Sequence, residues 1–142
     1  MLGTGLSGAL PAVPAGRLGA PRILVIDDSR SMRELLRLHL ANAGYEVVTA
    51  EDAIAGGKAL LVQSPDLIIT DINMPYMTGI EFVAALRADR TIPPIPVIFL
   101  SSRHEDLADH ARQLEAVAHL PKPVSLERLL GVVALHAGEG RT

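Results

Sequence analysis

The sequence contains no cysteine, no long apolar segment and no dense run of Lys and Arg, and each absence excludes a class of function. Without cysteine the chain has no disulfides, thiolate metal ligands or cysteine nucleophile, and the cytoplasm is its expected compartment. No apolar stretch approaches the roughly 18 residues that span a bilayer, so we expect no membrane insertion. The net charge of −3 offers little attraction to phosphate backbones, so direct nucleic-acid binding is not expected.

The composition divides the chain into a leader, one domain and a tail. Residues 1–21 are rich in Gly, Ala, Leu and Pro, and they lack the basic start and long apolar segment of a secretory signal. We expect them to form a flexible leader. The 142 residues, 49% of them hydrophobic, suffice for one core but are too few for two ordinary domains. The predicted domain covers 22–136, and 137–142 form a tail too short for an output domain.

From residue 22 onward, short apolar runs alternate with segments of helical pattern. Four of the runs stop abruptly at a polar side chain, which is typical of strands buried on both faces of a parallel sheet. Alternating strands and helices imply right-handed crossovers and an α/β fold. The expected strands cover 22–27, 45–49, 66–71, 96–101 and 117–120. The expected helices run from a capping box at Ser31 and Glu34 to Gly44, over 53–63, 80–87 and 105–115, and from the Ser125 cap to His136.

Five polar residues stand where these apolar runs end. Asp27 and Asp28 follow the first run, and Asp71, Ser101 and Lys122 follow three later ones. In an open parallel sheet the carboxyl ends of the strands share one edge, which is where ligands bind. Three carboxylates, one ammonium and one hydroxyl at that edge predict a site for a divalent cation and a phosphoryl group.

The chemistry of such a site follows from charge. Neighbouring carboxylates oppose one another's ionisation, and a bound Mg²⁺, which prefers oxygen ligands, relieves that repulsion. Asp71 can then act as a nucleophile, because carboxylates form aspartyl-phosphates. Phosphoryl transfer needs mainly positioning and charge neutralisation, which Mg²⁺, the Lys122 ammonium and the Ser101 hydroxyl would supply.

These residues together resemble a receiver domain of a two-component response regulator of the chemotaxis-regulator type. The resemblance is carried by the Asp27-Asp28 pair, by the segment D-I-N-M-P-Y-M-T-G from Asp71 to Gly79, by Ser101 and by Lys122-Pro123. It covers about 22–136. It implies a flavodoxin-like, doubly wound five-stranded parallel sheet in the order 2-1-3-4-5 with five helices, and a cis peptide bond before Pro123.

The resemblance also implies roles and partners. Asp71 matches the phosphoacceptor, Asp27 and Asp28 the metal-binding acids, Ser101 the switch hydroxyl, Lys122 the phosphate-contacting lysine, and Asn73 a metal ligand through its backbone carbonyl. The expected protein is a phosphoacceptor signalling domain rather than an enzyme, with only self-catalysed phosphorylation and dephosphorylation. It would accept its phosphoryl group from a sensor histidine kinase or a histidine phosphotransfer protein. A separate downstream protein or a relay would receive the signal.

The chain departs from the family pattern at two places. His119 stands where the family commonly has Tyr or Phe, which predicts a muted or pH-sensitive switch. The alternative is a half-exposed histidine that fills a strand end. Residues 114–117 lack the glycine that often ends the fourth helix, which predicts an irregular turn. Arg103 is either a residue that tunes dephosphorylation or a surface arginine without a role.

Two other functions remain open at this stage. A Mg²⁺-dependent phosphohydrolase of the haloacid dehalogenase type also places a nucleophilic Asp at a strand end. Such an enzyme needs a second acid two residues further on, where this chain has Asn73, and it usually carries a cap insertion for which this chain has no room. A phosphorylation-independent interaction module would be expected to have lost an acid or the lysine, and all of them are present.

Overall fold

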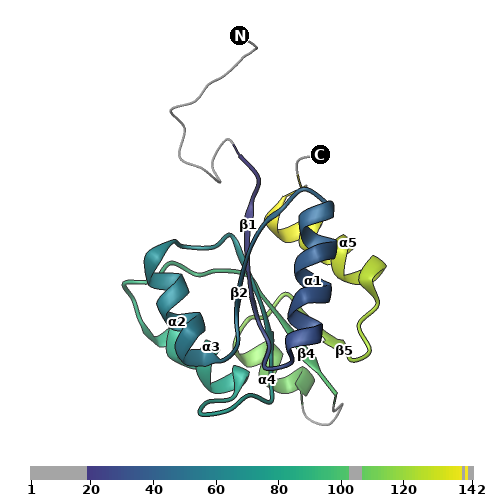
Figure 1. Ribbon diagram of the computed structural model, residues 1–142. Helices are drawn as coiled ribbons and strands as arrows, with labels where there is room; N and C mark the ends of the chain where they lie inside the picture. The colour runs from purple at the N-terminus through teal and green to yellow at the C-terminus, as the bar shows by residue number, and fades with distance from the viewer. Residues whose placement is uncertain (1–18, 103–106, 139, 141–142) are drawn as a thin grey trace.

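The computed structural model describes residues 19–102, 107–138 and 140, which form a five-stranded sheet flanked by five helices (Figure 1). The strands are parallel and lie in the order β2-β1-β3-β4-β5, so the predicted topology is confirmed. The strands are β1 (Arg22–Ile26), β2 (Glu46–Ala50), β3 (Leu67–Asp71), β4 (Val97–Ser101) and β5 (Ala118–Pro121). The helices are α1 (Arg30–Asn42), α2 (Ala53–Val62), α3 (Gly79–Ala88), α4 (Leu107–Gln113) and α5 (Leu126–Ala137). None of the described helices is long and apolar enough to cross a bilayer.

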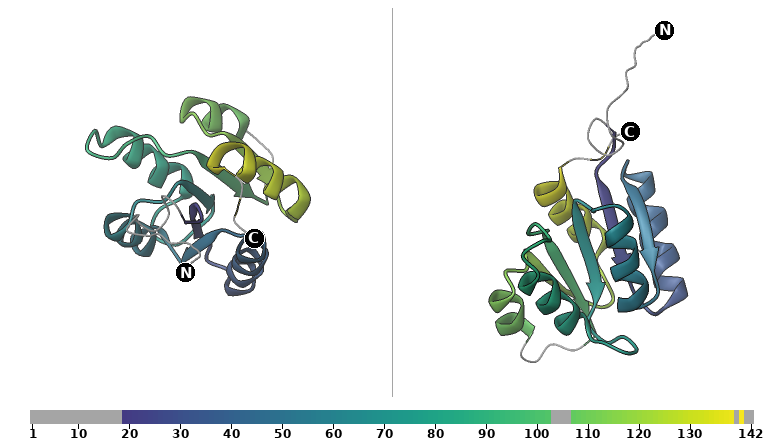
Figure 2. Two further views of the ribbon diagram at one scale, coloured as in Figure 1. Left: turned by 90° about the horizontal axis from the view of Figure 1, so that it is seen from above. Right: turned by 90° about the vertical axis from the view of Figure 1, so that its left-hand side faces the viewer.

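The sheet lies between two helical layers, as Figure 2 shows. Successive side chains of a strand point to opposite faces, so each apolar run supplies two cores. The three central strands are buried along their whole length, which explains why their sequences are continuously apolar. On the side of α1 and α5, the core contains Ile23, Val25, Leu36, Leu40, Leu129 and Val133. On the side of α2, α3 and α4, it contains Leu24, Ile26, Leu60, Phe82 and Ala111.

Helix α1 begins earlier than the sequence pattern predicts. Its N-cap is Ser29, whose hydroxyl accepts a hydrogen bond from the Met32 N–H at 3.3 Å, so the predicted capping box at Ser31 and Glu34 is wrong. The reason lies in the preceding turn, where the Ser29 N–H donates to Asp27 Oδ1 at 2.8 Å. This bond places Ser29, rather than Ser31, at the first helical turn.

Helix α1 ends at Asn42, and Gly44, two residues later, stops it as predicted. Gly44 has a φ of 96°, a left-handed conformation that glycine adopts without a steric penalty. The Gly44 N–H donates to the Ala41 carbonyl at 3.0 Å and the Tyr45 N–H to the Leu40 carbonyl at 3.1 Å. These two bonds form a Schellman motif, which satisfies the last carbonyls of the helix.

Helix α4 ends in the same motif without a glycine. The Glu115 N–H donates to the Arg112 carbonyl at 3.1 Å, and the Ala116 N–H donates to the Ala111 carbonyl at 2.8 Å. Glu115 occupies the left-handed position with a φ of 58°. The prediction of an irregular turn is therefore wrong, because the turn is a regular Schellman motif. Glu115 is strained in the left-handed conformation, where glycine would be unstrained.

Glu115→Gly should therefore stabilise the protein, by roughly 0.5–1 kcal/mol, because relief of the left-handed strain exceeds the added flexibility of glycine in the unfolded chain. Gly44→Ala, at the equivalent position of α1, should destabilise it by about 1 kcal/mol. Urea unfolding of both variants measures the two effects. A destabilised Glu115→Gly variant would contradict the assignment of strain to this residue.

Candidate functional site

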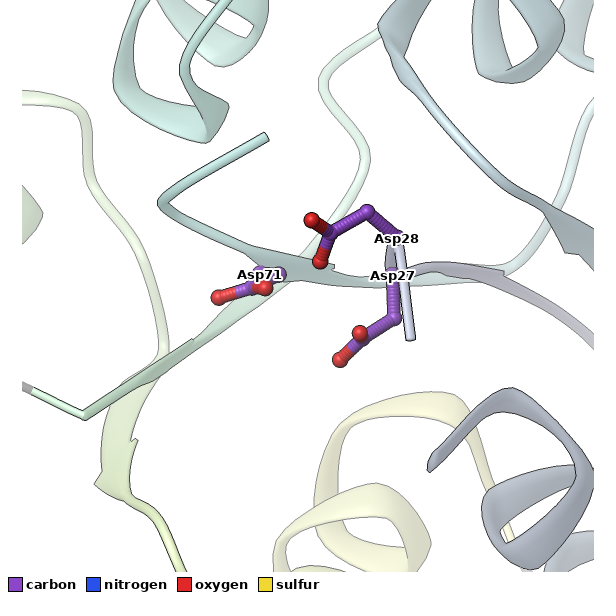
Figure 3. Close-up of side chains that lie close together, drawn as sticks. All are labelled: Asp27, Asp28 and Asp71. Atoms are coloured by element: carbon purple, nitrogen blue, oxygen red, sulfur yellow. The ribbon is translucent and has the colours of Figure 1, made fainter. Parts of the chain in front are cut away.

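Three carboxylates meet at the carboxyl ends of β1 and β3. Asp27 and Asp28 directly follow β1, and Asp71 is the last residue of β3. One carboxylate oxygen of each lies within 4.8 Å of the others, and Figure 3 shows the three side chains lying close together. Asp27 is fully buried and Asp71 is 5% exposed, whereas Asp28 is exposed. We call the site formed by these three carboxylates the acid pocket. It is buried at the carboxyl edge of the sheet and reaches solvent at Asp28.

Lys122 adds a positive charge to the acid pocket from the end of β5. Its Nζ lies 3.1 Å from Asp27 Oδ2 and 3.2 Å from Asp71 Oδ2, so one ammonium bridges acids from two strands. The Lys122 N–H donates to the Ser101 carbonyl at 2.7 Å, which continues the pairing of β4 and β5 beyond the strands. The bond from Lys122 to Pro123 is cis, as the resemblance implies.

The charges in the pocket are not balanced. Burial raises the pKa of Asp71, and the negative charge of Asp27 raises it further, against the opposing effects of Lys122 and the Ile72 N–H. Burial alone would lower the pKa of Lys122, but its hydrogen bond to Asp27 and the charge of Asp71 outweigh burial and hold that pKa above its usual value. Lys122 pairs with two of the three carboxylates, so the site carries an excess of negative charge that favours binding of a cation.

The turn after β1 is held in place from two sides. Asp27 Oδ1 accepts the Ser29 N–H at 2.8 Å, and Arg33 Nη1 donates to the Asp27 carbonyl oxygen at 2.8 Å. Arg33 lies in the first turn of α1 and is partly buried. Sequence reasoning missed this residue, because a basic residue at the start of an amphipathic helix looks like any solvated side chain.

The loop after β3 is also fixed. Asp71 Oδ1 accepts the Ile72 N–H at 2.8 Å, and the Gly79 N–H donates to the Ile72 carbonyl at 2.8 Å. Helix α3 then begins with a true capping box, in which Thr78 and Glu81 each bind the other's backbone N–H. A Cβ at Gly79 would overlap the Asp71 carbonyl oxygen. Only glycine lets the start of α3 approach the strand end that carries Asp71.

The remaining predicted residues lie at or near this edge. Ser101 is the last residue of β4, is 2% exposed, and follows Leu100, the partner of Asp71 in the β3–β4 register. Asn73 is exposed, two residues beyond Asp71. His119 is exposed on β5, opposite Phe99. Arg103 lies outside the described residues. The roles that the sequence predicts for these residues stay predictions.

The opposite edge of the sheet holds a groove of about 590 Å³ between the ends of α3 and α4. Arg87, one of the two arginines that line the groove, donates from Nε to the Leu114 carbonyl at 3.0 Å and from Nη1 to the Ile95 carbonyl at 2.8 Å. These bonds tie α3 to α4 and to the segment before β4. We assign Arg87 a structural role and place the chemistry at the acid pocket.

The acid pocket suits a small, hard cation. Carboxylate oxygens are the ligands that Mg²⁺ and similar ions prefer, and such ions typically use one or two carboxylates together with phosphate oxygens. The three acids supply that donor set, and a divalent charge would offset the repulsion that raises the pKa of Asp71. The pocket could therefore hold a metal ion beside a phosphoryl group.

Comparisons with known proteins agree with this geometry. Residues 23–134 match the family model of the response regulator receiver domain. The response regulators MprA from Mycobacterium sp. (strain KMS) and Mycobacterium ulcerans (strain Agy99) are each 37% identical over 111 residues, which is 77% of this chain and 47% of the relative. The chain thus spans about half the length of the curated relatives it matches.

Solved structures give the same result. The chemotaxis response regulator CheY4 of Vibrio cholerae is 34% identical, with a TM-score of 0.74 over 81% of this chain and 97% of that chain. The N-terminal domain of an uncharacterized protein from Wolinella succinogenes is 31% identical, with a TM-score of 0.76 over 82% of this chain and 94% of that chain. Both likenesses agree with the fold described above.

Gly79→Ala should destabilise the protein by at least about 2 kcal/mol, because its Cβ would displace backbone at the Asp71 carbonyl. Gly131→Ala is the matched control. Gly131 lies inside α5, and apart from its chain neighbours and the nearby backbone of its own helix, no atom lies within 4 Å of the place that its Cβ would occupy. This substitution should stabilise the protein by up to about 1 kcal/mol. Thermal unfolding of both variants tests the close approach. Equal effects of the two substitutions would refute it.

Asp71→Asn should raise the unfolding midpoint of the metal-free protein at neutral pH by roughly 2–4 °C. The pKa of Asp71 is raised by folding, so its ionisation costs stability as the pH rises through that pKa. The gain should therefore shrink at about pH 4 and below, where Asp71 is neutral in both states. A gain that does not change with pH would contradict the charge argument.

Proposed function

The chain belongs to the response regulator receiver family, and on this premise we propose that it accepts a phosphoryl group on Asp71 from a histidine kinase or a histidine phosphotransfer protein. Receiver domains are signalling domains rather than classical enzymes, and they generally interact with histidine kinases and downstream effectors. The observation that carries the proposal is the acid pocket, in which Asp71 lies beside two further acids and the Lys122 ammonium.

Asp71 is the best nucleophile of the three acids. Asp27 is fully buried, and its two oxygens bind the Ser29 N–H and the Lys122 ammonium. Asp28 is exposed, so water solvates its charge. Asp71 is buried enough to have a raised pKa, and a poorly solvated carboxylate is a stronger base and nucleophile once ionised. It also begins the segment, from Asp71 to Gly79, that matches the family motif.

The transfer itself is a displacement at phosphorus. An Asp71 carboxylate oxygen forms a bond to phosphorus while the bond from phosphorus to the donor's imidazole nitrogen breaks. The electron pair of that bond leaves with the imidazole, which is neutral because its other nitrogen carries a proton. Lys122 is placed to bind a phosphoryl oxygen without leaving the pocket, since its Nζ already lies 3.2 Å from Asp71 Oδ2. The Ser101 hydroxyl would donate to another oxygen.

A bound Mg²⁺ would neutralise charge on the acids and on the phosphoryl oxygens. The residues proposed to hold it are Asp27, Asp28 and Asp71 through their carboxylates and Asn73 through its backbone carbonyl. The chain's own contribution is to keep these groups in position: Arg33 holds the turn after β1, and Gly79 allows the close approach of α3. Since these are hard oxygen donors, Mg²⁺ fits them better than softer metals.

The signal would arise from contacts that the phosphoryl group makes better in one conformation than in another. Lys122 exchanges part of its pairing with Asp27 for the phosphoryl group, and Ser101 moves toward the same group. Both residues adjoin β5, where His119 is exposed and would take the place of the family's aromatic switch residue. We propose that a separate downstream protein or a relay partner, in the cytoplasm, reads this change.

Acetyl phosphate with Mg²⁺ should add one phosphoryl group to the protein, and Asp71→Asn should abolish the addition. Asp109→Asn is the matched control, because Asp109 is an exposed acid on α4 that pairs only with Arg112 among the contacts described. Intact mass spectrometry measures the added group, and chelation of Mg²⁺ should prevent it. Full labelling of Asp71→Asn would refute Asp71 as acceptor.

Two rival functions have distinct outcomes. Catalytic turnover of a small phosphate ester, with no lasting acyl phosphate, would favour a phosphohydrolase. Partner binding and cellular output unchanged by Asp71→Asn would favour an interaction module that does not depend on phosphorylation.

A further inference from the structure

Tyr76 adopts a backbone conformation that disfavours its side chain. Its φ is 73°, and the Met77 N–H donates to the Pro75 carbonyl at 2.8 Å, so Tyr76 is the centre of a γ-turn of the rarer, strained hand. Glycine, asparagine or aspartate would adopt a positive φ at less cost than a bulky aromatic residue. A tyrosine held in such a conformation is a candidate functional residue, because backbone strain collects at functional sites.

The loop around Tyr76 is anchored at both sides, so the ring is presented in a defined place. Met74 packs against the core on the side of α2, α3 and α4. On the other side, the Gly79 N–H binds the Ile72 carbonyl and the capping box at Thr78 begins α3. The bonds that fix this loop are the same bonds that position the end of β3.

Tyr76 is exposed to solvent on the loop that follows the Asp71 end of β3. Its side chain is 81% exposed, the neighbouring Pro75 and Met77 are also exposed, and residues 74–78 carry no charge. Tyr76 is five residues from Asp71 on a loop that starts at the pocket. A protein that brings a phosphohistidine to Asp71 must therefore come close to this apolar loop.

We propose that Tyr76 is a docking residue for the protein that carries the phosphohistidine, with its ring packed against an apolar surface of that donor beside the reactive histidine. The proposal rests on the proposed function. Aromatic side chains are frequent anchors at interfaces, since they bury a large area at little conformational cost. The loop favours a donor over a second copy of this chain, because a copy seated on Tyr76 would cover the acid pocket that must remain accessible.

Three variants separate this role from others. Tyr76→Asn removes the ring and suits a positive φ, so it should fold at least as stably as the unmodified protein. Tyr76→Phe keeps the ring. Leu61→Asn is the control for loss of an exposed apolar side chain: Leu61 is 80% exposed near the end of α2, at the opposite edge of the sheet.

The experiment compares two phosphodonors on full-length protein. The small donor is acetyl phosphate, and the protein donors are the complete set of histidine kinases encoded in the same genome, each phosphorylated with ATP. For the kinase that labels the unmodified protein fastest, Tyr76→Asn should lower kcat/KM about tenfold, mainly through KM. Tyr76→Phe and Leu61→Asn should stay within about twofold, and labelling of all variants by acetyl phosphate should be unchanged.

Several results would overturn the inference alone. Equal transfer from the kinase to Tyr76→Asn and to the unmodified protein would remove the docking role. Slower labelling of Tyr76→Asn by acetyl phosphate would show that Tyr76 shapes the pocket instead. A changed oligomeric state in sedimentation would assign the ring to self-association. Labelling by acetyl phosphate with no transfer from these kinases, or from the histidine phosphotransfer proteins that they phosphorylate, would leave Asp71 as acceptor but overturn the inference together with the proposed donor. By contrast, no labelling of Asp71 by either donor would refute the proposed function itself.

Discussion

The ion pairs of Lys122 with Asp27 and Asp71 are the interaction on which the site depends. A single ammonium lies 3.1 Å and 3.2 Å from carboxylates at the ends of two different strands. Without the lysine, two buried acids would face each other unpaired, which is costly in a poorly solvated position. With it, the acids stay close enough to share a cation. The same ammonium is therefore a structural counter-ion and, in the proposed function, the group that binds a phosphoryl oxygen.

Backbone contacts also hold the acids of the pocket in place. Arg33 binds the Asp27 carbonyl, and Gly79 allows α3 to approach the Asp71 carbonyl, so both strand ends are held through main-chain atoms. In each of the two acids, Oδ1 accepts a backbone N–H and Oδ2 pairs with Lys122. A displacement of either strand end would weaken both ion pairs at once, because Lys122 contacts them both.

The sequence predicts most of this architecture because buried strands have apolar sequences that are easily recognised. Three strands buried on both faces read as continuous apolar runs, and the polar residue that ends each run marks the sheet edge. Features that depend on backbone geometry are harder to predict from the sequence. The N-cap at Ser29 depends on the turn formed with Asp27, and Arg33 acts through a main-chain oxygen. The left-handed Glu115 breaks the expectation of glycine.

A similar distinction applies to recognition, between the buried acids and the exposed Tyr76. The reactive groups are buried and their positions follow from strand ends, so any receiver with these residues can present a similar acid pocket. Discrimination between donors requires contacts outside the pocket that differ in free energy from one donor to another. The loop that carries Tyr76 is suited to this, since it shares the hydrogen bonds that fix Asp71 and yet exposes its ring to a partner. In the proposed function, changing that ring would alter which donor is preferred without moving the acids of the pocket.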